Sequence, residues 1–147
     1  MGRGSARDPG CAGGTAALSA FLDTNVVIRH FTGDPPALAA RATAALAAAE
    51  ELLLADLVVA ECVYVLESFY EVSRERVAEL MRPAIALPSI KTIDSPTLLR
   101  ALEVYELERL DFAEAYLVAQ AEATGVGTVL SFDKSIDRVG AVKRQEP

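Results

Sequence analysis

The fold is decided by a short apolar run that ends on an acid, Ala20-Phe21-Leu22-Asp23, followed by helical spacing over residues 26–30. The same pattern returns at residues 127–132, a run typical of a strand, which ends at Asp133. Between them, apolar runs of strand length alternate with helical patterns, which predicts parallel β–α–β units. We therefore expect an α/β fold with three α/β/α layers and a mostly parallel sheet of four or five strands.

The length and the composition indicate one domain. The chain has 147 residues, of which 52% are hydrophobic, enough to bury a sizeable core. We expect this domain over residues 19–147. Residues 1–18 hold five of the nine glycines and are predicted to form a flexible extension. No apolar run reaches the roughly 18–20 residues of a membrane span, and two cysteines without CxxC spacing favour the reducing cytoplasm.

The charge balance is acidic. Fourteen Lys and Arg residues stand against 21 Asp and Glu, which leaves a net charge of −7 and a pI near 4.7. A broad basic face for gripping nucleic acid is therefore not expected, because phosphate binding normally relies on Lys and Arg.

Several acids occupy positions where chemistry is possible. Asp23 and Asp133 directly follow strands, and the carboxyl ends of parallel strands border ligand crevices. Asp also starts turns and caps helices, so neither position is decisive alone. Glu61 falls on the apolar stripe of a helical segment, where a carboxylate needs a cation, a hydrogen-bond donor or water. A structural ion pair with an arginine explains Glu61 equally well.

Asp111 and Glu114 allow two interpretations. Their spacing matches a capping box at the start of a helix, which is the better interpretation without context. The same spacing also places both carboxylates at one helix end.

If these acids share one crevice, a functional role becomes more favourable than a structural role for each of them. Two like charges about 4 Å apart repel by about 4 kcal/mol at an effective dielectric constant of about 20. A cluster of such groups either raises its pKa values or captures a hard divalent cation. Ligation by oxygen alone, without His or Cys, selects Mg²⁺ or Mn²⁺.

Four short motifs in register resemble PIN-domain ribonucleases, and more narrowly the VapC-type toxins of toxin–antitoxin pairs. They are Phe21-Leu22-Asp23-Thr24-Asn25-Val26, Val59-Ala60-Glu61-Cys62, Asp111-Phe112-Ala113-Glu114 and Ser131-Phe132-Asp133. The resemblance covers residues 19–147 and implies a metal-dependent ribonuclease with a PIN-like fold.

The resemblance also implies roles for single residues. Its metal-binding catalytic carboxylates would be Asp23, Glu61, Asp111 and Asp133. Many relatives carry a second Asp where this chain has Glu114, so Glu114 and Asp111 are both candidates for the third ligand. Residues that orient the site would be Asn25 and Ser131.

The resemblance further implies partners: an RNA substrate, a second copy in a homodimer, and an antitoxin whose inhibitory segment occupies the acidic cleft. Arg pairs bidentately with carboxylates, which suits such a segment. Candidate RNA contacts are Arg29, Lys134 and Arg138, together with Lys143 and Arg144. A solvated surface position is the simpler interpretation for each of these five.

Other functions fit the chain less well. A haloacid-dehalogenase-like phosphatase needs a second acid where Asn25 stands, a receiver-like domain needs paired acids before Asp23, and nucleotide-binding glycine loops are missing. The serious alternative is a PIN-fold RNA-binding or regulatory module that is non-catalytic or serves a housekeeping role.

Overall fold

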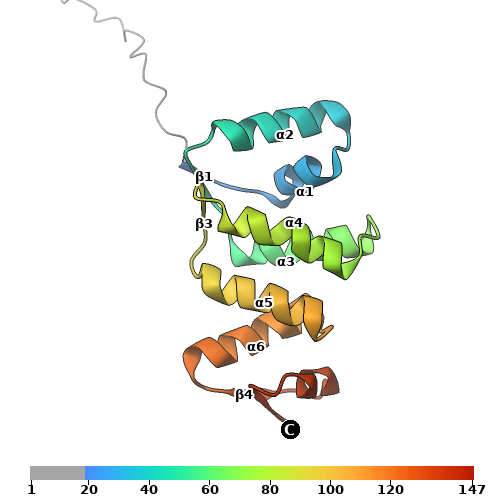
Figure 1. Cartoon of the computed structure of the whole chain (residues 1–147), viewed down its shortest axis with the longest axis vertical. Helices are drawn as coiled ribbons and strands as arrows, with labels where there is room; N and C mark the ends of the chain where they lie inside the picture. The colour runs from blue at the N-terminus through green and yellow to red at the C-terminus, as the bar shows by residue number, and fades with distance from the viewer. Residues whose placement is uncertain (1–18) are drawn as a thin grey trace, which may run out of the picture.

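The computed structural model describes residues 19–147, and its strands and helices alternate along the chain as the sequence predicts (Figure 1). The expected extension over residues 1–18 lies outside the described part. The strands are β1 (Ser19–Phe21), β2 (Glu51–Leu53), β3 (Ile90–Lys91), β4 (Thr128–Leu130) and β5 (Lys143–Gln145). The helices are α1 (Thr24–Thr32), α2 (Pro36–Ala48), α3 (Asp56–Ser68), α4 (Arg74–Ala86), α5 (Ser95–Leu107) and α6 (Phe112–Thr124), with a 3-10 helix at Lys134–Arg138.

All strand pairs in the described residues are parallel, which confirms the predicted α/β class. The three strands β1, β2 and β3 form one sheet in that order, with Ala20 opposite Leu52 and Leu52 opposite Ile90. The strands β4 and β5 form a second sheet, with Val129 opposite Arg144.

The five strands are thus divided between two sheets instead of forming one continuous sheet. Helix α6 packs on α5, and α5 packs on α4, so the chain leaves the first sheet before β4 forms. In Figure 1, α5 and α6 lie between the first sheet and β4 along the longest axis of the molecule. Helix packing therefore separates strands that the sequence pattern alone would place together.

The core follows the apolar stripes of the helices. The apolar stripe on α5 consists of Leu98, Leu102 and Tyr105 and is fully buried. It meets buried side chains of α3, α4 and α6, among them Leu66 and Met81. No helix within residues 19–147 has the length and apolar character needed to span a membrane.

Candidate functional site

Asp23 stands at the carboxyl end of β1 and begins α1. Its backbone is extended, and its Oδ1 accepts a hydrogen bond from the Thr24 N–H at 2.9 Å. This is the helix cap that the sequence suggests for an Asp after a strand. The residue stays exposed, so the capping contact does not remove its carboxylate from solvent.

Glu61 meets Asp23 across a hollow of about 330 Å³ between α1 and α3. The Thr24 hydroxyl donates a 2.6 Å hydrogen bond to Glu61 Oε2. Glu61 is exposed, so it is not the buried carboxylate that its place on the apolar stripe suggests. Within the described residues it has no ion pair, and a buried threonine supplies the donor instead.

Thr24 was not among the predicted site residues, although it lies directly between Asp23 and Asn25. Its side chain is buried, and it joins α1 to α3 by its contact with Glu61. The available signal was a hydroxyl next to a predicted site acid. Asn25 lines the same hollow, which the sequence predicted to be a site position.

A cation and two aromatic rings complete this hollow, which we call the Asp23 hollow. Arg29, a predicted RNA contact, lines it. So do Phe69 and Tyr70, whose ring centroids lie 4.9 Å apart in an edge-to-face arrangement. Phe69 is 76% exposed. No sequence motif indicates this aromatic pair, because the two residues follow the end of α3 and approach the acids only in the folded chain.

Asp111 and Glu114 line a different hollow of about 460 Å³, together with Glu67 on α3. Asp111 precedes α6, yet its side chain makes no capping hydrogen bond, so the predicted capping box does not form there. The Asp111 carboxylate instead lies 3.9 Å from the Arg74 guanidinium. Glu114 Oε2 is buried and has no hydrogen-bond partner within the described residues.

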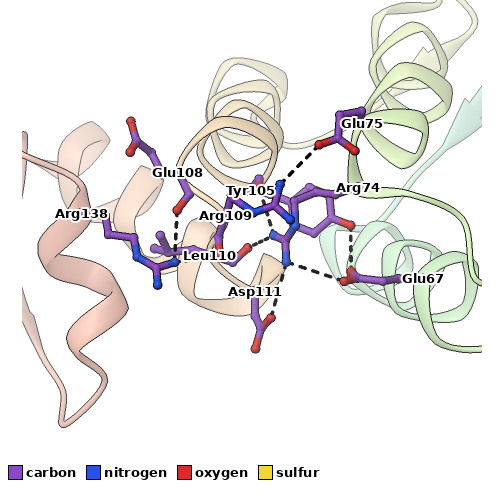
Figure 2. A network of polar contacts seen from close by, with 9 residues as sticks. All are labelled: Glu67, Arg74, Glu75, Tyr105, Glu108, Arg109, Leu110, Asp111 and Arg138. Atoms are coloured by element: carbon purple, nitrogen blue, oxygen red, sulfur yellow. Dashed lines mark hydrogen bonds and ion pairs between the residues drawn. The ribbon is translucent and has the colours of Figure 1, made fainter.

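Arg74 organises the surroundings of Asp111 (Figure 2). Its guanidinium donates to the carbonyl oxygens of Tyr105, at 2.8 Å, and Leu110, and lies 4.2 Å above the Tyr105 ring. It also lies 3.6 Å from Glu67, which accepts a 2.8 Å hydrogen bond from the Tyr105 hydroxyl. Burial, followed by this bond to Glu67, raises the pKa of Tyr105. Asp111 therefore sits at the edge of a structural network.

Asp133 occupies a third place, in the turn after β4. Its Oδ1 accepts a 2.8 Å hydrogen bond from the Ser135 N–H, and its own N–H donates to Ser131 Oγ at 2.9 Å. The hydrogen bonds from Ser135 lower the pKa of Asp133, with a smaller contribution from the charges of Arg138 and Arg144. Ser131 thus helps to shape the Asp133 turn, and its role in orienting the site stays a prediction.

Two of the four remaining predicted RNA contacts, Lys134 and Arg138, differ in their surroundings. Lys134 is exposed beside Asp133. Arg138 is engaged elsewhere: its guanidinium donates to the carbonyl oxygens of Glu108, at 3.4 Å, and Arg109, at 3.2 Å, just after α5 (Figure 2).

The five predicted site acids therefore lie in three places. Asp23 and Glu61 share one hollow, Asp111 and Glu114 share another, and Asp133 lines neither. Within residues 19–147, no three His, Cys, Asp or Glu side chains gather into a set that would hold a metal ion. The oxygen donors have the right chemistry for Mg²⁺ or Mn²⁺, but their arrangement in a single chain does not fit a metal centre.

The acids of the Asp23 hollow act on the buried Cys62 thiol. Burial, together with the charges of Glu61 and Asp23, raises the pKa of Cys62 from its ordinary value of 9.0 to about 12. In a chain carrying Cys11→Ser, we expect Cys62 to resist Ellman's reagent at pH 8 until guanidinium unfolds the protein, because the thiolate is the reactive form. Labelling of the native protein at the rate of free cysteine would contradict this expectation.

The same shift predicts a loss of stability at high pH. Between about pH 9 and pH 12 the unfolded thiol loses its proton while the folded thiol keeps it. The unfolded state then binds fewer protons, so the free energy of unfolding falls as pH rises through this window. Urea denaturation should be compared between the Cys11→Ser chain and a Cys11→Ser/Cys62→Ala chain. The difference between their free energies of unfolding should become smaller as pH rises, because only the first chain carries the Cys62 thiol.

Comparison with known proteins identifies one family. The model of the PIN domain family matches residues 20–142, which include all five predicted site acids. No curated protein matches the chain.

Proposed function

Because this chain belongs to the PIN domain family, a nuclease-type fold that generally depends on divalent metal ions, we propose that it is a Mg²⁺- or Mn²⁺-dependent ribonuclease and the toxin of a toxin–antitoxin pair. The observation that carries the proposal is the meeting of Asp23 and Glu61 in one hollow beyond the carboxyl end of β1. Ligand crevices in parallel sheets form at such ends.

The surroundings of these two acids favour RNA as the substrate. Exposed Phe69 offers an aromatic face beside the carboxylates, and unpaired bases of single-stranded RNA stack on such faces. Arg29 supplies a positive charge at the same hollow, suited to a phosphate. In this proposal Thr24 holds Glu61 in place through its hydroxyl, and Asn25 borders the substrate.

The proposed partner follows from the charge of the hollow. An inhibitory antitoxin segment with an arginine would pair with Asp23 and Glu61, because a guanidinium matches carboxylate geometry. The acid excess of the chain supports a basic partner of this kind.

One observation favours a second function, an RNA-binding module without catalysis. No hollow in the single chain holds more than two of the five acids, and the described residues contain no set of three that suits a metal. Such a module would bind RNA through Arg29 and Phe69 without cutting it.

A cleavage assay separates the two functions. Purified protein should cut end-labelled single-stranded RNA when Mg²⁺ or Mn²⁺ is added and should stop cutting when EDTA is added. The Asp23→Ala variant should be inactive, and the exposed-acid variant Glu50→Gln should cut like wild type. Binding of RNA without cleavage under every metal condition would favour the non-catalytic RNA-binding module. Cleavage that persists in EDTA would contradict the metal-dependent mechanism.

A further inference from the structure

The two sheets leave four outer strand edges, and these edges differ in charge. β3 has two residues and carries Lys91, and β5 carries Lys143 and Arg144. Short strands and lysines are the usual protection of a sheet edge against unwanted pairing. β1 (Ser-Ala-Phe) and β4 (Thr-Val-Leu) carry no charge at all. The two unprotected edges are therefore those of β1 and β4.

Both unprotected edges expose large apolar side chains. Phe21 on β1 is 75% exposed, and Leu130 on β4 is 67% exposed. Parallel sheets are normally covered on both faces, and a two-stranded sheet is marginal by itself. Within residues 19–147, the surfaces around β1 and β4 therefore lack the cover and the strand neighbours that a parallel sheet needs.

No strand of the described part of the chain pairs with the outer side of β1 or β4. Leu22 donates its N–H toward β2, to Leu53 O at 2.8 Å, and Ser131 donates toward β5, to Gln145 O at 3.0 Å. Adjacent residues of a strand direct their backbone groups to opposite sides, so Phe21 and Leu130 direct theirs to the open sides. Each open side thus offers donors and acceptors to another parallel strand.

We infer that β1 of one copy of this chain pairs in parallel with β4 of a second copy, and that the reciprocal pair forms by two-fold symmetry. Within one chain the two edges lie far apart along the longest axis, with α5 and α6 between them (Figure 1). A second copy satisfies both edges at once and closes the assembly, as exchange of an element between protomers does. Each resulting sheet has the order β3-β2-β1-β4-β5, with the charged strands outermost.

This pairing completes the acidic site across the two copies, an extension that rests on the proposed nuclease function. Parallel strands place their carboxyl ends at the same sheet edge. Asp23 follows β1 and Asp133 follows β4, so the pairing brings Asp133 of the partner subunit toward Asp23 and Glu61. The third carboxylate that the single chain keeps apart is then supplied by the second copy.

The first test measures the assembly without any assay of activity. Sedimentation or light scattering should give twice the chain mass for wild type. Leu130→Lys should shift the protein to monomer, because it places a charge on the unprotected β4 edge. The control is Ile93→Lys, an equally large change at an exposed residue just after β3, the outer strand that the inferred pairing does not use. This variant should stay dimeric. A monomeric wild type, or equal behaviour of the two variants, overturns the inference.

The second test identifies which strands meet. In a Cys11→Ser background, Phe21→Cys and Leu130→Cys chains of different mass are mixed, denatured and refolded together, then treated with a short bismaleimide. Cross-linked heterodimers are expected, whereas either variant alone should cross-link poorly. Efficient cross-linking within single chains that carry both cysteines, without heterodimers in the mixture, would show that the chain closes on itself and would overturn the inference.

The third test asks whether the copies share a site. Asp23→Ala and Asp133→Ala chains are each expected to be inactive. Co-refolding them should restore about a quarter of wild-type RNA cleavage, because half of the dimers are mixed and each mixed dimer has one intact site of two. No recovery beside an active wild type overturns site sharing. An inactive wild type that is still dimeric and cross-linked overturns the nuclease proposal instead and leaves the strand pairing standing.

Discussion

Replacing Arg74 with methionine should lower the free energy of unfolding by about 3 kcal/mol, because two carbonyl oxygens lose a charged donor and each buried acceptor left unpaired costs about 1–3 kcal/mol. Its side chain is only 13% exposed. The change removes the donor to two carbonyl oxygens, of Tyr105 and Leu110, and the cation that lies over the Tyr105 ring and beside Glu67. Urea denaturation at pH 7 measures the loss.

Arg76→Met on the same helix is the matched control. Arg76 is exposed and pairs with Glu79 at 2.9 Å, one helical turn away. Such a surface pair contributes about 0–1 kcal/mol, so this variant should unfold nearly like wild type. Similar small losses for both variants would show that the Arg74 network contributes little to folding.

Replacing Glu61 with glutamine should lower RNA cleavage on the order of 100-fold or more, the scale for removing one preorganised electrostatic group from an active site. The neutral side chain keeps an oxygen that accepts from the Thr24 hydroxyl. It removes one of the two negative charges of the Asp23 hollow. Stability should stay equal or rise, because the repulsion between Glu61 and Asp23 disappears.

Two measurements on this variant separate function from folding. Cleavage of labelled RNA should fall while urea denaturation shows no loss of stability, and Glu50→Gln should change neither. The Cys62 thiol should also titrate at a lower pH in Glu61→Gln, because Glu61 contributes to its raised pKa. Full cleavage by Glu61→Gln would remove this residue from the proposed site.

Much of the fold could be predicted because its signals are local. The apolar run before Asp23 indicated β1, and Asp23 begins α1 as expected. Gly125 adopts a left-handed backbone with φ of 74° at the end of α6, the conformation in which a glycine commonly ends a helix. Hydrophobic periodicity and terminal caps act over a few residues, so a single sequence is enough to indicate them.

The candidate site could be predicted only in part. Asp23, Asn25 and Glu61 share a hollow as the motifs suggested. Thr24 and Phe69 could be identified as part of it only from the tertiary structure, in which α1 packs on α3. The function of Asp111 and Asp133 stays a prediction. Their positions, beside Arg74 and in the turn after β4, depend on how α5 and α6 leave the first sheet.

Local sequence was enough for the order of strands and helices, for their parallel class, and for the acids that follow β1 and β4. Tertiary structure alone decided that the five strands divide into two sheets and that Arg74 binds the carbonyl oxygens of Tyr105 and Leu110. The physical reason is the distance along the chain over which each interaction acts. A cap or an apolar stripe is set by neighbours along the chain, whereas the meeting of distant segments depends on how whole helices pack against one another.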